Sequence, residues 1–133
     1  MDRLSRRMWR RTALMVLVLV AMLTAACGGK EKVVTWNDNG RRLETAVGQT
    51  VVVQLDSDPS TGYTWVIESI DEAALVPVVI GAYKTKENGE GGYQEFRFEA
   101  KIGHDVNLRI AYRPVDDATA PAQKTFAMEV AIR

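Results

Sequence analysis

Residues 96–101 read Phe96-Arg97-Phe98-Glu99-Ala100-Lys101, so that every second side chain is apolar. In an extended chain successive side chains point to opposite faces, so this order gathers apolar groups on one face and charged groups on the other. The pattern predicts a β-strand that buries one face and exposes the other.

The same alternation, or a run of comparable strand character, recurs along most of the chain. The further segments are residues 32–36, 41–46, 51–55, 63–69, 76–84, 108–112 and 126–132. Short turn signals such as residues 37–40 and 47–49 separate them, and no long stretch has a period of 3.6 residues. Seven or eight short strands in about 100 residues predict an all-β, immunoglobulin-like β-sandwich, with a small closed barrel as the alternative.

Residues 1–26 differ in character from the rest of the chain. Five arginines lie among the first 11 residues, and an almost unbroken apolar run follows at residues 13–26. Crossing the hydrocarbon core of a membrane takes about 20 apolar residues, so this run is too short to span it. A basic head, an apolar run and small residues at the end together predict a cleaved signal peptide.

Cys27, the only cysteine, follows directly. Leu23-Thr24-Ala25-Ala26-Cys27 resembles a bacterial lipobox, in which the cysteine is acylated and becomes the new N-terminus. Residues 27–31 then form a flexible tether, because Gly28 and Gly29 favour a mobile chain. We therefore expect residues 32–133 to form the domain of an exported protein, lipid-anchored in the cell envelope or secreted if Cys27 is not acylated.

The charge balance of the predicted mature chain is acidic. Residues 1–26 carry five arginines and one aspartate of the 17 basic and 17 acidic residues, which leaves 12 basic and 16 acidic residues. Binding to nucleic acid needs a basic face, so this composition argues against that class of partner. We expect a monomer of about 107 residues, long enough to bury a core without disulfides.

The sequence offers little for catalysis. His104 is the only histidine and lies in an apparent turn, so no Cys–His pair, Ser–His–Asp triad or histidine-rich zinc site is available. Carboxylate pairs at residues 56 and 58 or 116 and 117 resemble the acid and base of a glycosidase, but so short a chain leaves little material for a substrate cleft. Gly89–Gly92 lacks the lysine of a phosphate-binding loop. We predict no enzyme, no cofactor and no metal site.

Three connections stand out as longer, polar and rich in glycine or proline. They are residues 56–61, 87–92 and 114–123. The strand count places all three at the same end of the sandwich, and loops gathered on a rigid scaffold commonly carry function.

These loops carry motifs that resemble one family. Asp58-Pro59-Ser60-Thr61-Gly62-Tyr63-Thr64-Trp65 is followed by Gly89-Glu90-Gly91-Gly92 and then by Arg113-Pro114. In this order and spacing they are similar to the loops of the chagasin family of cysteine protease inhibitors (inhibitor family I42), which also occurs as bacterial lipoproteins. The resemblance covers the whole predicted domain. It implies a reversible, non-covalent inhibitor of papain-like cysteine proteases whose three loops occlude the active-site cleft. The protease-binding residues that it implies are Asp58, Pro59, Ser60, Thr61, Gly62, Tyr63, Gly89, Glu90, Gly91, Gly92, Arg113, Pro114 and Val115.

The resemblance also implies roles for single residues. Pro59 and Gly62 stiffen the first loop, while the small side chains of Ser60 and Thr61 enter the cleft and form hydrogen bonds there. Gly91 and Gly92 let the second loop approach the protease closely, and Arg113 and Pro114 shape the third loop. Tyr63, with Trp65, holds the base of the first loop.

Two positions depart from the family pattern. Asp58 replaces an asparagine, and Val115 replaces an aromatic anchor of the kind that dominates many interfaces. The second departure leaves an alternative open, namely a non-inhibitory envelope lipoprotein whose sandwich recognises another protein or a surface polymer.

Overall fold

The structure, a computed structural model, describes residues 30–133. Eight strands make up most of this part of the chain. They are β1 (Lys32–Thr35), β2 (Arg42–Thr45), β3 (Thr50–Ser57), β4 (Tyr63–Ser69), β5 (Leu75–Thr85), β6 (Gly92–Ala100), β7 (Asp105–Pro114) and β8 (Lys124–Ile132). The prediction of an all-β sandwich is confirmed. Within these residues no helix has the length and apolar character needed to cross a membrane.

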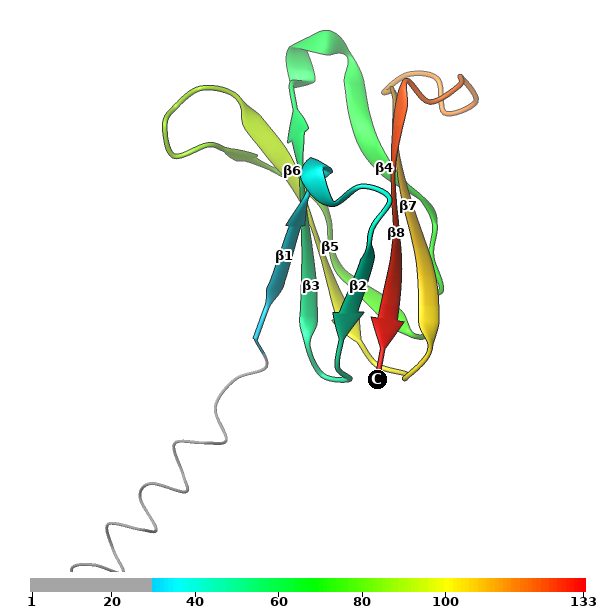
Figure 1. The fold of residues 1–133 in the computed structure, drawn as a ribbon. Helices are drawn as coiled ribbons and strands as arrows, with labels where there is room; N and C mark the ends of the chain where they lie inside the picture. The colour runs from blue at the N-terminus through cyan, green and yellow to red at the C-terminus, as the bar shows by residue number, and fades with distance from the viewer. Residues whose placement is uncertain (1–29) are drawn as a thin grey trace, which may run out of the picture.

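The strands form two four-stranded sheets that face each other (Figure 1). One sheet has the order β1-β3-β6-β5 and the other the order β2-β8-β7-β4. The alternating apolar residues lie between the sheets, where Phe96, Phe98, Leu108, Ile110 and Phe126 are completely buried. The period of two in the sequence therefore corresponds to the inner and outer faces of the sandwich.

The connection between β1 and β2 differs from a hairpin turn. A 3₁₀ turn, η2 (Trp36–Asp38), follows β1 and leads the chain across to the other sheet. The carboxylate of Asp38 accepts a hydrogen bond of 2.9 Å from the backbone N–H of Thr35 and so closes the start of this turn. Both strands then pair in parallel with distant partners, β1 with β3 and β2 with β8.

Gln94, an amide side chain in the core, links the sheets on the side where β4 and β5 are the edge strands. Its Oε1 accepts hydrogen bonds from the backbone N–H of Trp65 at 2.8 Å and from the Ser57 hydroxyl at 3.0 Å. Its Nε2 donates to the carbonyl oxygens of Trp65 and Gly81, both at 3.3 Å. One buried amide thus joins β3, β4, β5 and β6 below the loops.

The three connections β3–β4, β5–β6 and β7–β8 project from the same end of the sandwich (Figure 1, top). In the sheet registers Ser57 is opposite Gly92, and Tyr63 is opposite Pro114, so the strands of each sheet end at similar heights. The first and third loops are each one residue shorter than the sequence predicts, because residues 56 and 57 belong to β3 and Pro114 ends β7. The second loop keeps its predicted length but is shifted by one residue, because Gly92 begins β6.

Candidate functional site

The first loop is a single stiffened 3₁₀ turn. The turn, η3 (Pro59–Thr61), begins after Asp58, whose carboxylate accepts a hydrogen bond of 3.0 Å from the backbone N–H of Ser60. It ends at Gly62, which has φ +77°, a left-handed conformation that residues with a side chain resist. Proline fixes φ at the first position of the turn, so both ends of the loop are restricted.

The hydroxyl groups of this loop are occupied within the protein. Ser60 Oγ donates to the Asp58 carboxylate at 2.7 Å, and Thr61 Oγ1 donates to the Asp58 carbonyl oxygen at 2.7 Å. Thr61 Oγ1 also lies 3.2 Å from the phenol oxygen of Tyr112. In this state the loop presents a fixed shape rather than free hydroxyl donors, which differs from the role implied for Ser60 and Thr61 by the resemblance.

Asp58, at the position of the family's asparagine, acts as the cap of this turn. The hydrogen bonds from the Ser60 hydroxyl and then from the Ser60 backbone hold the pKa of the Asp58 carboxyl below its ordinary value. The residue is exposed, so its negative charge is displayed at the loop end. Capping by an aspartate side chain is as effective as capping by asparagine.

A cluster of aromatic rings supports the first loop from below. Tyr112 stacks on Tyr63 at 5.3 Å between ring centroids and lies 4.9 Å from the ring of the buried Trp65. The Trp65 indole N–H donates to the Asp56 carbonyl oxygen at 2.9 Å. The ammonium group of Lys124 lies over the rings of Tyr112 and Trp65 at 5.0 and 5.3 Å from their centroids. Tyr112 and Lys124 of this cluster lie outside the three loop motifs, so no motif in the sequence pointed to them.

The second loop, residues 86–91, is a tight turn closed by its own backbone. The Gly89 N–H donates to the Lys86 carbonyl oxygen at 2.9 Å, and the Lys86 N–H donates to the Gly91 carbonyl oxygen at 3.1 Å. Gly89 and Gly91 have φ +74° and +73°, which explains both glycines by conformation. The Lys86 ammonium lies 2.9 Å from the Asp56 carboxylate and connects this loop to β3.

Gly92 has a different reason to be glycine. A Cβ at this position would lie 2.3 Å from the ring of Tyr83 and 2.6 Å from the Lys84 carbonyl oxygen. The residue is buried at the start of β6. The close approach that requires glycine here is therefore made by the neighbouring strand β5 of the same sheet.

The third loop, residues 115–123, is tied to the first. The Val115 N–H donates to the Gly62 carbonyl oxygen at 2.9 Å. Arg113, near the end of β7, donates to the Ala120 carbonyl oxygen and to the Glu68 carboxylate, so its guanidinium shapes the loop from within. Pro114 is half-buried, whereas Val115 is 67% exposed and stands free at the loop end.

Three of the four carboxylates considered as catalytic groups, Asp56, Asp58 and Asp117, have structural partners. Asp117 accepts hydrogen bonds from the hydroxyl and backbone N–H of Thr119, which lower the pKa of its carboxyl. Asp56 pairs with Lys86.

His104 lies at the opposite end of the sandwich, with its Nε2 2.9 Å from the Asp71 carboxylate. Among residues 30–133 no three potential ligands gather as a metal site would require. Cys27 lies outside the described residues.

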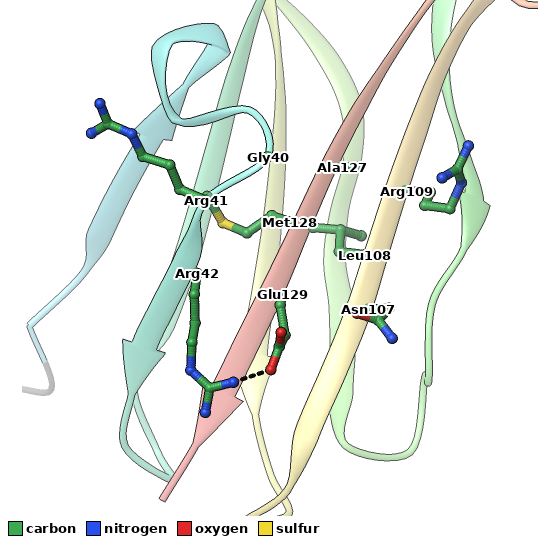
Figure 2. Close-up of a pocket in the computed structure, with 9 residues that line it drawn as sticks. All are labelled: Gly40, Arg41, Arg42, Asn107, Leu108, Arg109, Ala127, Met128 and Glu129. Carbon is green, nitrogen blue, oxygen red and sulfur yellow. Dashed lines mark hydrogen bonds and ion pairs between the residues drawn. The ribbon is translucent and has the colours of Figure 1, made fainter.

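One hollow lies away from the three loops, over strands β2, β8 and β7 (Figure 2). Its volume is about 410 Å³. Arg42, one of its lining residues, pairs with Glu129 on the neighbouring strand β8 and, at 3.4 Å, with Asp105. These opposite charges neutralise one another, so the loop end remains the stronger candidate for binding.

The described residues thus form a β-sandwich that presents three stiffened loops at one end, two of them joined by a hydrogen bond, which is the architecture of a loop-based binding protein. Residues 44–130 match the family described as "Chagasin family peptidase inhibitor I42". The chain belongs to this family. Its members are peptidase inhibitors, and the expectation that the chain is not an enzyme is therefore confirmed.

Individual relatives agree with this assignment. Chagasin from Trypanosoma cruzi is 36% identical over 85 residues, which cover 56% of this chain and 76% of chagasin. The crystal structure of the cysteine protease inhibitor EhICP2 from Entamoeba histolytica superposes with a TM-score of 0.69 at 18% identity, covering 77% of this chain and 96% of that one. The solution structure of amebosin gives 0.62 at 21% identity, with 79% and 100% covered. At these identities the two structures support the fold.

Proposed function

We propose that this protein is a reversible, non-covalent inhibitor of papain-like cysteine proteases that occludes the active-site cleft with its three loops. The observation that carries the proposal is the gathering of residues 58–62, 86–91 and 115–123 at one end of the sandwich of a chagasin-family chain. The thirteen residues singled out in the sequence all lie in these loops or at the adjoining strand ends.

The rigidity of the first loop suits an inhibitor. Pro59, Gly62 and the hydrogen bonds to Asp58 fix the turn before any partner arrives. Ordering a flexible loop on binding costs about 0.5–1.5 kcal/mol for each immobilised side chain, and a loop that is already ordered avoids much of this cost. A stiff turn also resists the extended conformation in which a protease cleaves its substrates.

The other two loops widen the contact. The exposed backbone of Gly89–Gly91 can lie against one wall of the cleft, and Val115 can lie against the other. The bond from Val115 to Gly62 keeps the first and third loops at a fixed spacing. Three loops of fixed geometry form a blunt wedge. A wedge of this shape is complementary to a groove on a partner and not to a flat partner surface.

A binding experiment with papain tests occlusion of the cleft. The domain, residues 30–133, should bind free papain and bind weakly to papain whose catalytic cysteine carries a covalent peptide-like inhibitor. Thr61→Arg should abolish binding, because a long charged side chain would stand at the tip of the wedge. Ser69→Arg, at an exposed position at the far end of β4, is the matched control and should bind as the wild type does. Equal binding to free and blocked papain would refute occlusion.

One observation favours a second function. Val115 stands 67% exposed where the family motif has an aromatic residue, so the loop end lacks one expected anchor. A non-inhibitory envelope module would retain the scaffold and bind a different protein or a surface polymer. Capture from envelope extracts that depends on Thr61, together with no effect on papain, would favour this function.

We also propose that residues 1–26 direct export, that Cys27 carries a lipid and that residues 27–31 act as a tether for a monomeric domain. The direction of β1 supports this arrangement. Lys32 pairs with Val51, near the start of β3, whereas the loop end lies beyond Ser57. An anchor before Lys32 would therefore hold the loops away from the membrane. Mass spectrometry of the membrane fraction should find acylated Cys27, and Cys27→Ser should release the protein.

A further inference from the structure

Trp36 is a large aromatic residue outside the three loops, yet its side chain remains 42% exposed. It begins η2, the turn that carries the chain from β1 across to β2. Its ring is held in place by Trp65, at 6.0 Å between centroids, and by the ammonium group of Lys124, at 5.6 Å from the centroid. The exposed part of the ring is therefore presented in a fixed orientation.

Trp36 also lines a hollow of about 440 Å³, which we call the Trp36 hollow. Asn37, Gln54, Lys86 and Tyr93 line it as well. Lys86 is the first residue of the second loop, and Lys124, which contacts the Trp36 ring, directly follows the third loop. Trp36 thus occupies the space between the bases of the second and third loops.

The height of Trp36 suits a contact with a protease that receives the loops. Thr35 is opposite Gln54, which lies four residues before the first loop begins at Asp58. Trp36 is one residue nearer to the loops, so three residues at about 3.3 Å each place it roughly 10 Å below the first loop. When the three loops enter the cleft of a protease, the walls of the cleft lie beside the end of the sandwich, below the loop tips. The rim of the cleft would then arrive at the level of the Trp36 hollow.

Resting on the proposed function, we propose that Trp36 and the Trp36 hollow form a fourth contact with the protease and receive the rim of its active-site cleft. Tryptophan is the residue type most enriched among interface residues that dominate affinity. The amides of Asn37 and Gln54 and the phenol of Tyr93 can each donate and accept hydrogen bonds with a polar rim. Trp36 thereby supplies an aromatic anchor at the loop end of the sandwich, where Val115 replaces the aromatic residue of the family motif.

Inhibition of papain by the domain and its variants tests this contact. Trp36→Ala should weaken inhibition by about 30-fold, the loss typical of an aromatic anchor. Since Trp36 also packs on Trp65, a second variant leaves the ring in place: Gln54→Arg fills the hollow from β3 and should weaken inhibition at least about 10-fold. Ile102→Ala removes a side chain that is 48% exposed at the opposite end, and it should change inhibition less than about twofold.

The outcomes separate this contact from the proposed function. If the wild-type domain does not inhibit papain, the proposed function fails. If the wild type inhibits and either Trp36→Ala or Gln54→Arg stays within twofold of it, the fourth contact is overturned while the three-loop proposal stands. A change in mass by light scattering in Trp36→Ala would also overturn it, because the surface would then serve a second copy of the chain.

Discussion

Replacing Gln94 by leucine should destabilise the domain strongly, although leucine is of similar size and the site is buried. Gln94 is 7% exposed, and its amide joins four strands across the open side of the sandwich. Leucine would leave two donors, the Trp65 backbone N–H and the Ser57 hydroxyl, without their acceptor. It would also leave two acceptors, the carbonyl oxygens of Trp65 and Gly81, without their donor. Because β4 is an edge strand, no neighbouring strand can replace the lost bond to Trp65.

The expected loss follows from these contacts. A buried polar group left without a partner costs about 1–3 kcal/mol. The Trp65 N–H has the shortest bond to Gln94 and cannot rotate toward another acceptor, whereas the Ser57 hydroxyl can turn. Taking about 2 kcal/mol for the first group and about 1 kcal/mol for the second gives a loss of about 3 kcal/mol. For a domain of this size the Tm should fall by about 15 °C.

Urea unfolding of residues 30–133, followed by tryptophan fluorescence, measures this loss. Gln54→Leu is the matched control, because Gln54 is the same residue type on the outer face of β3. Surface changes of this kind typically alter the free energy of unfolding by less than about 0.5 kcal/mol. Equal losses in the two variants, or a Gln94→Leu variant as stable as the wild type, would refute the reasoning. Unequal m-values would indicate a change in compactness rather than in stability alone.

Other substitutions test the loop end. Tyr112→Phe removes the hydroxyl beside Thr61, so the free energy of unfolding should fall by about 1 kcal/mol or less while dissociation from papain becomes faster, as stopped-flow kinetics would show. Gly92→Ala should lower the Tm more than Gly62→Ala in thermal melts, because only at Gly92 does the new methyl carbon meet a backbone carbonyl oxygen, at 2.6 Å. The pKa of Asp58 is lowered in the fold, so its capping contribution is complete above the ordinary aspartate value of 3.8 and is lost as the pH falls below it. Amide hydrogen exchange in residues 60–62 should accelerate over that acidic range beyond its intrinsic pH dependence, and unchanged protection would contradict the capping role.

The fold was largely predictable because the alternation of Phe96, Phe98 and Ala100 with charged residues depends only on local order in the chain. The crossing of the chain from one sheet to the other between β1 and β2 was not predictable. The turn signal at residues 37–40 is the same whether the turn joins two strands of one sheet or strands of two different sheets. The parallel pairs β1–β3 and β2–β8 depend on residues far apart in the sequence. Nothing in a local period of two determines which strands become neighbours.

The site was predictable in outline for a similar reason. Pro59 and Gly62 reveal a stiff turn by their own backbone restrictions, wherever the rest of the chain lies. Tyr112 is 51 residues from Thr61, and only the completed sandwich brings their oxygens to 3.2 Å. The crowding that requires glycine at position 92 was not predictable, because it comes from Tyr83 on the neighbouring strand, which the sequence of the loop does not reveal.

The most direct test of the central claim is a titration of papain with the domain of residues 30–133, followed by mass spectrometry of the domain after incubation. The account predicts inhibition that saturates at one domain per protease, competes with substrate, is reversed by dilution and leaves the domain intact. No inhibition at about 10 µM, where even a modest affinity of about 7 kcal/mol would be detected, would contradict it. So would steady cleavage of the domain within residues 58–62, because a loop that is cut as a substrate does not block the cleft.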